Sequence, residues 1–371
     1  MPERVGRGKT ARAFAFARRE QSFRTQRDVS PRRSRRGWVV AADVSKAISC
    51  GELFRWILLG SLGSLGSLGS LARLARLARS LARLAGVQAW QLVEVVAMQL
   101  VEVDVSTFNR RFRVDLDDGT AVEAVLYRGD TLCVSSQVGC AVRCPFCASG
   151  ARGLTRGLNL DELWGQVQRV MELGHQVARV TVSGVGEPLH NHEAVRAFVL
   201  RCREQRIGPS FTTSGGPLQR LAEWLSLPHN GLTISVHAGT DARRAQLVPK
   251  GPPLAPLFEL LADNLPRLSR KRRKKVALAY LAMAGRNDDE EEVDAFIERA
   301  LPLQLAVHLY AYNPVPTSGD APITRARYEQ LYERMRAAGL VVRMSSQARI
   351  EANGGCGTLV ALRLPQHTQI V

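Results

Sequence analysis

The sequence offers little that would hold the protein in a membrane or stabilise it outside the cell. The apolar stretch Phe54–Leu59 is too short to span a membrane, and its flanks do not match those of a signal peptide. Cysteine is also scarce: the seven cysteines are an odd number, and three of them crowd into one loop, which argues against a framework of disulfides. We therefore expect a cytoplasmic protein in a reducing compartment, without membrane attachment.

Acidic residues are scarce in the first quarter of the chain. Of the 51 basic and 34 acidic residues, residues 1–90 hold 18 and 5. The same quarter repeats Ser-Leu-Gly over Gly60–Gly69 and Leu-Ala-Arg over Leu71–Arg83, and this three-residue period drifts round a helix instead of holding one face. We interpret residues 1–90 as a basic, low-complexity, disordered extension. The alternatives are a basic helix at Leu71–Ala85 that meets RNA or an anionic surface, and a translation start placed too far upstream.

A second concentration of positive charge lies at Arg270–Lys275, where six consecutive residues are basic. Lysine and arginine side chains that neutralise phosphates are the usual source of affinity for nucleic acids. The run therefore indicates either a contact with RNA or an ordinary solvated surface, and the sequence favours neither.

Beyond the extension, the hydrophobic pattern becomes that of an α/β protein. Two strands, Arg111–Leu116 and Ala121–Tyr127, flank an Asp-Asp-Gly turn and predict a β-hairpin within residues 91–130. From residue 131 to 338, strands alternate with helices, which predicts parallel βαβ units. We therefore expect residues 131–371 to form a partial (βα)6 barrel, whose chemistry collects at the C-terminal ends of its strands.

The expected elements of the barrel follow from the hydrophobic pattern, which switches between the two-residue period of strands and the 3.6-residue period of helices. Its strands are Thr131–Ser136, Arg179–Ser183, Ser210–Thr213, Leu232–His237, Lys275–Met283 and Leu305–Ala311, with a last strand at Leu340–Met344. Its helices are Asn159–Leu173, Glu193–Gln205, Leu218–Leu225, Leu254–Leu265, Asp289–Arg299 and Ile323–Ala338. The polar motifs considered next fall at the ends of these strands.

Three cysteines follow the first barrel strand with the spacing C-x3-C-x2-C: Cys140, Cys144 and Cys147. Thiolates that converge in this way suit an iron–sulfur cluster or zinc. A structural zinc site normally has four protein ligands, yet no histidine or cysteine follows Cys147 until His175. The motif therefore predicts a [4Fe–4S] cluster with one open iron that can hold a substrate or cofactor; a zinc site is the alternative.

Polar residues also end three later strands. Gly184 and Gly186 would let the backbone approach a ligand closely, and Glu187 can accept hydrogen bonds from an ammonium group. His237 ends the fourth strand and Asn313 the sixth. Taken alone, each of these is as typical of an ordinary turn or of a structural histidine.

Two further cysteines lie outside the motif. Cys356 is flanked by glycines, and Cys133 lies seven residues before Cys140. Two such thiols could act as a redox or covalent-catalysis pair, and inert buried cysteines are the alternative. We assign Cys50 and Cys202 to the inert kind.

The stretch from about Phe112 to Leu362 resembles the radical S-adenosylmethionine (SAM) RNA adenine methyltransferases. That family comprises the 23S rRNA adenine-C2 methyltransferases, which also act on tRNA, and adenine-C8 relatives that confer antibiotic resistance. The phrases that carry the resemblance are Leu132–Cys140, Gly184–Leu189, Ser235–Ala238, Pro249-Lys250 and Gly355–Gly357.

The resemblance implies a role for each of these positions. Cys140, Cys144 and Cys147 would bind the [4Fe–4S] cluster, whose open iron SAM would chelate. The residues implied to contact SAM are Gly186, Glu187, Thr212, Ser235, Val236, His237 and Asn313; Thr212 stands where the family usually has serine. Cys356 would become S-methylated, Cys133 would be its resolving partner, and Glu123 would be the proton acceptor, although the turn between Glu123 and Cys133 is shorter than in the family.

The resemblance also implies the reaction. One SAM methylates Cys356, and a second SAM, reduced through the cluster, yields a radical that activates the S-methyl group. The methyl carbon joins a ring carbon of adenine, with C2 favoured over C8, and attack by Cys133 on Cys356 then releases the product and leaves a disulfide. The implied partners are RNA (rRNA, with tRNA as a second candidate) and an electron donor such as flavodoxin or ferredoxin. We expect a monomer.

Two departures from the family concern the substrate. The helical accessory domain that usually precedes the barrel is not recognisable here, and residues 345–350 differ from the more acidic phrase common in the family. Two alternatives therefore remain open. One is a radical SAM methyltransferase that acts on a different RNA or a small molecule, and the other is a non-catalytic, metal-bearing RNA-binding protein.

Overall fold

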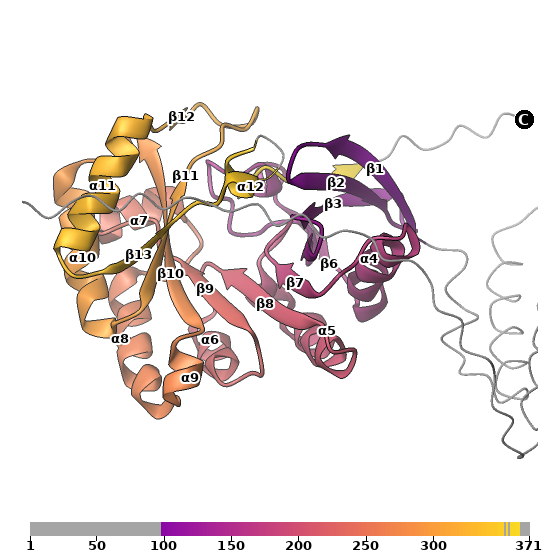
Figure 1. Ribbon diagram of the computed structural model, residues 1–371, viewed down its shortest axis with the longest axis horizontal. Helices are drawn as coiled ribbons and strands as arrows, with labels where there is room; N and C mark the ends of the chain where they lie inside the picture. The colour runs from indigo at the N-terminus through magenta and orange to yellow at the C-terminus, as the bar shows by residue number, and fades with distance from the viewer. Residues whose placement is uncertain (1–97, 352–353, 355–356, 364–371) are drawn as a thin grey trace, which may run out of the picture. The chain divides into compact units, whose positions relative to one another are not determined.

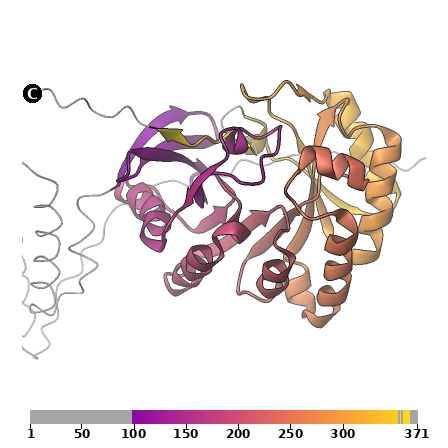
Figure 2. The same ribbon diagram turned by 180° about the vertical axis from the view of Figure 1, so that it is seen from behind.

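The computed structural model describes residues 98–351, 354 and 357–363 of the chain. The expected extension over residues 1–90 lies outside these residues, as do Cys50 and Cys356. The described part is built around one large curved sheet, with helices along its outer side (Figures 1 and 2).

Seven neighbouring strands of this sheet run parallel. In their order across the sheet they are β4 (Thr131–Val134), β7 (Arg179–Val182), β8 (Gly208–Thr213), β9 (Gly231–Ser235), β10 (Val276–Ala284), β11 (Ala306–Ala311) and β13 (Val341–Met344). All of them coincide with strands expected from the sequence. The expected α/β fold with a barrel-like parallel sheet is thus confirmed.

Three antiparallel strands extend the sheet beyond β4. The expected hairpin is present as β2 (Asn109–Asp115) and β3 (Thr120–Tyr127), and β3 pairs with β4. β1 (Gln99–Val105) pairs with β2 and was not expected. Its valines are among the exposed large apolar residues, so the strand has no buried face whose pattern would mark it. A two-residue strand, β14 (Leu362–Arg363), returns the C-terminal segment to β3.

Six long helices cross over between the parallel strands, as the sequence predicts. They are α4 (Leu160–Glu172), α5 (His192–Glu204), α6 (Leu218–Leu225), α8 (Leu254–Asn264), α10 (Glu290–Ala300) and α11 (Arg325–Ala337). Three short helices were not expected, because they are too short to show a helical period: α7 (Asp241–Leu247), α9 (Arg270–Arg273) and α12 (Gln347–Ile350). None of the described helices has the length and apolarity that crossing a membrane requires.

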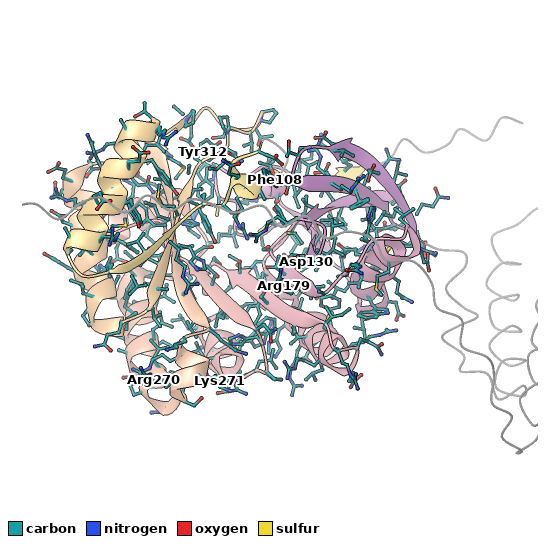
Figure 3. The ribbon with its side chains drawn as sticks, viewed as in Figure 1. Phe108, Asp130, Arg179, Arg270, Lys271 and Tyr312 are labelled. Atoms are coloured by element: carbon teal, nitrogen blue, oxygen red, sulfur yellow. The ribbon has the colours of Figure 1, made fainter. Side chains whose placement is uncertain are left out.

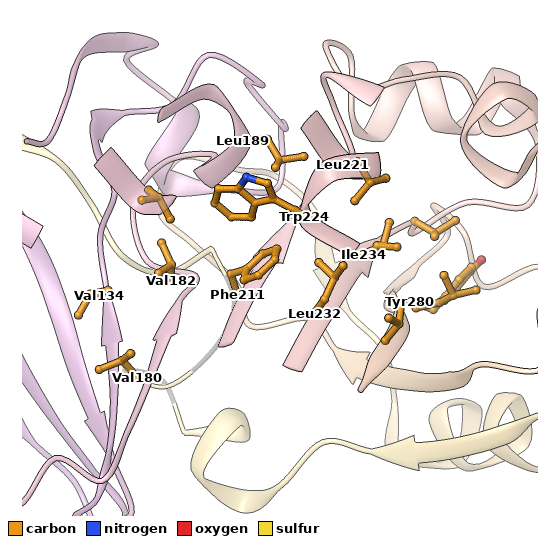
Figure 4. Packing of buried hydrophobic residues seen from close by; sticks show 14 of the residues in the cluster. Val134, Val180, Val182, Leu189, Phe211, Leu221, Trp224, Leu232, Ile234 and Tyr280 are labelled. Atoms are coloured by element: carbon orange, nitrogen blue, oxygen red, sulfur yellow. The ribbon is translucent and has the colours of Figure 1, made fainter. Parts of the chain in front are cut away.

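The main core fills the space between the sheet and the long helices (Figure 4). Trp224 of α6 is 1% exposed and packs edge-on against Phe211 of β8, with the ring centroids 4.5 Å apart. Its indole N–H donates a hydrogen bond of 2.8 Å to Nδ1 of His192 at the start of α5. Trp224 thus connects α5 and α6 to β8.

Replacing Trp224 tests this packing. Trp224→Ala is expected to lower the free energy of unfolding by about 3–5 kcal/mol, because it leaves a large cavity. Trp224→Phe keeps most of the apolar volume and is expected to cost less, while leaving Nδ1 of His192 without its donor. Urea unfolding followed by circular dichroism measures both. Gln219→Ala, on the exposed side of the same helix, is the control and should change the free energy by no more than about 0.5 kcal/mol; a Trp224→Ala value in that range would contradict the described core.

Candidate functional site

The C-terminal ends of the parallel strands surround a cavity of about 120 Å³. Parallel strands bring their C-terminal ends to one edge of the sheet, so loops far apart in the sequence meet there. The cavity is lined by residues of the cysteine loop after β4, of the loops after β7, β8 and β9, of β10 and β11, and of the C-terminal segment. This is the edge at which the sequence places the polar motifs.

A small hairpin fixes the start of the cysteine loop. β5 (Gln137–Gly139) pairs antiparallel with β6 (Leu154–Gly157), and the N–H of Cys140 donates to the Gly153 carbonyl at 2.9 Å. Gly139 has a φ of +83°, and a Cβ at this position would lie 1.9 Å from the Gly153 oxygen. The hairpin therefore requires glycine immediately before the first cysteine of the motif.

The thiols of Cys140, Cys144 and Cys147 all line the cavity. Burial raises the pKa of Cys140 to about 12 and raises the pKa of Cys144 well above its ordinary value, and the negative charge of neighbouring thiolates adds to both. A metal centre supplies the positive charge that lets such thiols ionise together. Within the described residues no three ligating side chains converge on the position of a single metal ion. An iron–sulfur cluster does not need that convergence, because its cysteines bind separate irons.

The loop after β7 holds the Glu187 carboxylate in a fixed orientation. Glu187 is 4% exposed; its Oε1 accepts hydrogen bonds from the Thr213 hydroxyl at 2.5 Å and the Leu189 N–H at 3.1 Å. Its Oε2 accepts from the Ser214 N–H at 2.7 Å. Gly186, with a φ of +111°, has no room for a Cβ, which would lie 2.7 Å from a serine hydroxyl. A carboxylate has about four acceptor positions, so three donors leave capacity for a cationic group of a ligand.

His237 presents a neutral imidazole to the cavity. Its Nδ1 accepts a hydrogen bond from the Leu281 N–H at 3.0 Å, and burial lowers its pKa to about 3. The remaining ring proton is therefore on Nε2, which is a donor. The ring meets Phe146 edge-on at 5.6 Å between centroids. The site thus contains a hydrogen-bond donor that adds no charge at neutral pH.

A buried arginine ties two strand ends together beneath the cavity. Arg244 of α7 is 1% exposed, and its guanidinium donates to the carbonyls of Ser235 and Ser214, both at 2.6 Å. Burial lowers its pKa to about 10, and the negative charges of Cys144 and Glu187 oppose that shift. Arg244 therefore stays protonated at neutral pH and places one positive charge beside the thiols.

Most of the expected SAM-binding residues are brought together at the cavity. Those that line it are Gly186, Glu187, Thr212, Ser235 and His237. Two others do not line it: Val236 is fully buried in the main core, and Asn313 donates from Nδ2 to the carbonyls of Arg349 and Glu351, both at 3.0 Å. Asn313 thus holds the segment that leads into the C-terminal loop.

The expected thiol pair is only partly within the described residues. Cys133 is buried on β4, and its Sγ lies 3.3 Å from the hydroxyl oxygen of Ser183, which lines the cavity. Cys356 lies outside the described residues. Its near neighbour Gly357 lines the cavity, and the carbonyl of Gly357 accepts a hydrogen bond of 2.8 Å from the Ala148 N–H.

Glu123 lies beside the C-terminal segment and does not line the cavity. It is 5% exposed on β3, and its Oε2 accepts a hydrogen bond of 2.9 Å from the Val360 N–H. Arg111 is 3.9 Å from Oε1. Burial raises the pKa of Glu123, and the Val360 N–H and the Arg111 charge oppose that shift.

Sequence reasoning missed several polar residues of the site. Ser183, Thr213 and Ser214 line the cavity beside residues that the motifs did mark, and strand-end position alone could have indicated them. The Ser214 hydroxyl is buried without a hydrogen-bond partner among the described residues, so it is available to a ligand. Arg244 had no usable signal, because in a short polar helix it looks like a solvated arginine.

Comparison with known proteins agrees with this site. The radical SAM superfamily matches residues 134–300. The dual-specificity RNA methyltransferase RlmN of Marinomonas sp. (strain MWYL1) is 32% identical over 291 residues, which cover 73% of this chain and 78% of the relative. RlmN 1 of Myxococcus xanthus (strain DK1622) is 33% identical over 270 residues, covering 68% and 74%.

A solved structure supports the same assignment. The radical SAM methyltransferase from Sphaerobacter thermophilus superposes with a TM-score of 0.64 at 26% identity, covering 76% of this chain and 96% of that one. Membership of the radical SAM superfamily implies SAM and an iron–sulfur cluster, and the residues present suit both in their chemistry: three cysteines for the cluster, and a buried carboxylate and hydroxyls for the polar groups of SAM. The protein is therefore a SAM-dependent radical methyltransferase and belongs to the RlmN family.

Proposed function

We propose that the protein methylates a ring carbon of an adenine in RNA, C2 in preference to C8, by way of an S-methylated Cys356. The proposal includes two SAM molecules per turnover. The observation that carries it is the anchoring of the C-terminal segment at the cavity of the three cysteines. Gly357 lines that cavity, and a Cβ on it would lie 3.3 Å from the Cys147 Sγ. The segment that bears Cys356 thus reaches the thiol loop.

Cys140, Cys144 and Cys147 would hold a [4Fe–4S] cluster in this cavity. Thiolates held this close together repel one another and need a positive centre. Within the described residues no three ligating side chains converge on one metal ion, as a zinc site would require. When bound, the cluster and SAM supply the one-electron chemistry that activates a methyl group. Arg244 contributes a fixed positive charge close to the thiolates, which lowers the cost of burying them.

The strand-end residues would orient SAM. Glu187 would accept a hydrogen bond from its ammonium group, because that carboxylate is fixed by three donors and retains acceptor capacity. His237 would donate from Nε2, and the Thr212 and Ser235 hydroxyls would supply neutral contacts. The Asn313 contact would use Oδ1, because Nδ2 is already bonded to two carbonyls.

Side chains beside the SAM contacts would transfer protons and resolve the covalent intermediate. Cys133 would attack Cys356 as a thiolate, and the Ser183 hydroxyl at 3.3 Å can take part in removing its proton. A second hydroxyl, that of Thr181, lies 3.2 Å beyond Ser183 and extends the path. Glu123 would accept the ring proton; its raised pKa makes it a better base than an exposed carboxylate.

The proposed partners follow from the relatives, whose names describe RNA methyltransferases. We propose rRNA as the first substrate and tRNA as the second, with a flavodoxin or ferredoxin as electron donor. We further propose that the protein acts as a monomer in the cytoplasm and that residues 1–90 form a basic extension to the 131–371 methyltransferase core.

Anaerobic purification tests the cluster. Cys144→Ala is expected to remove the brown colour and most of the bound iron, which we expect at about four atoms per chain in the unaltered protein, because a thiolate of the motif is removed. Iron analysis and visible absorption measure both. Cys202→Ala, in α5 away from the cavity, is the matched control and should retain the iron. A colourless zinc-containing protein would contradict the assignment as a radical enzyme.

The thiol pair is tested by two substitutions. Cys356→Ala should abolish methyl transfer to RNA, because the methyl group then has no sulfur to carry it. Cys133→Ala should instead accumulate a covalent protein–RNA adduct, because nothing can release Cys356 from the product. Mass spectrometry of digested protein and RNA detects each outcome. Full activity of Cys356→Ala would refute the covalent route while leaving the cluster assignment untouched.

A further inference from the structure

The run of six basic residues lies at the opposite end of the barrel from the cavity. α9 (Arg270–Arg273) directly precedes β10, so it lies at the N-terminal edge of the parallel strands, whereas the cavity lies at their C-terminal edge (Figure 1). Leu281 of β10 lines the cavity and lies six residues beyond Lys275, which at about 3.3 Å per residue separates the two places by roughly 20 Å. Side chains of this run therefore do not reach a nucleotide bound in the cavity.

The topology brings further positive charges to the same edge. Arg203, in the last turn of α5, donates to the Asn230 side-chain oxygen at 3.3 Å, and Lys275 donates to the His229 carbonyl at 3.1 Å. Arg272 donates to carbonyls at the C-terminal end of α6. Burial lowers the pKa of Lys275, and the charges of Arg203, Arg272 and a neighbouring lysine lower it further. Three basic side chains thus gather round one loop between α6 and β9.

Four more basic side chains at this edge have no partner of their own. Arg270, Lys271, Arg273 and Lys274, here called the α9 basic surface, form no ion pair and no side-chain hydrogen bond with any described residue. Arg270 and Lys271 project from the outer end of the barrel in Figure 3. Elsewhere on the described surface, some exposed arginines pair with acids, as at Asp130–Arg179 in the same figure, and others, such as Arg152 and Arg196, do not. The α9 basic surface differs in that four unpaired basic residues lie within five consecutive positions of the chain. Like charges gathered without counter-charges repel each other, and a polyanion relieves that repulsion.

We propose that the α9 basic surface binds the phosphate backbone of a folded RNA, at a place distant from the nucleotide that is methylated. The choice of RNA rests on the proposed function, because RNA is the polyanion that the proposed reaction brings to this protein. Unpaired lysine and arginine side chains gain affinity by releasing counterions from phosphates, and they need no contact with bases. The surface therefore adds affinity and orientation, whereas the cavity selects the base.

A matched pair of double variants tests the proposal. Arg270→Gln with Arg273→Gln removes two charges from the α9 basic surface. Arg325→Gln with Arg336→Gln removes two exposed arginines of α11 that are paired with Glu329 and Glu333. Both variants have the same net charge, so the contribution of the remaining basic residues is held constant.

The measurement is fluorescence anisotropy of a labelled RNA duplex that has no unpaired adenine, titrated with the full-length protein at several salt concentrations and without SAM. The α9 variant should bind several-fold more weakly, and the slope of log affinity against log salt should fall by about 0.9 for each phosphate that the variant no longer neutralises. The α11 variant should match the unaltered protein. Equal slopes for all three proteins, or equal shifts in both variants, would overturn the proposal.

A second measurement uses the unaltered protein and so does not depend on how the variants fold. Lys271 and Lys274 should be protected from acetylation when the duplex is bound, as read by mass spectrometry of the digested protein. No protection would overturn the proposal, as would protection by anionic lipid vesicles in the absence of protection by RNA. Neither measurement involves methyl transfer, so a failed proposal here is distinguishable from a failed assignment of the reaction.

Discussion

The backbone of Ser214 lies between the two buried charges of the site. Its N–H donates to the Glu187 carboxylate, and its carbonyl accepts from the Arg244 guanidinium. Buried charges are costly unless hydrogen bonds satisfy them, so the end of β8 and the loops that meet it have little freedom to move apart. Arg244 also bonds to Ser235 at the end of β9. The wall of the cavity is thereby fixed before a ligand binds, which is the condition for precise orientation of reacting groups.

This fixed wall lets three parts of the chain supply different components. The loop between β5 and β6 supplies the thiols, the strand ends supply polar groups, and the C-terminal segment contributes Gly357 to the cavity lining. That segment is held by several contacts far apart in sequence: the Tyr127 hydroxyl donates to the Gly354 carbonyl at 2.9 Å, and the Ser149 hydroxyl donates to the Leu359 carbonyl at 2.7 Å. In the proposed reaction, a covalent carrier on this segment would therefore sit on a tethered loop, while the strand-end groups proposed to orient SAM would stay in place.

The sequence predicted those parts of the structure that leave a local pattern in it, either a hydrophobic period or a fixed spacing of one residue type. Strand and helix alternation predicted the parallel sheet, and the spacing of Cys140, Cys144 and Cys147 predicted the thiol site. It could not predict β1, whose valines face outward, nor the role of Arg244, whose partners are carbonyls of residues distant in sequence. Asn313 was identified by its position, but its side-chain bonds to the α12 segment depend on tertiary contacts.

In the proposed site, three thiolates bind three irons of the cluster and leave the fourth iron for SAM. Electron–nuclear double resonance of the reduced protein tests this most directly, with SAM isotopically labelled at its amino and carboxyl groups. We predict hyperfine coupling between the cluster and both labelled groups, and its loss when Glu187→Gln weakens the ammonium contact. A reduced cluster without coupling to either label would show that SAM does not bind the open iron.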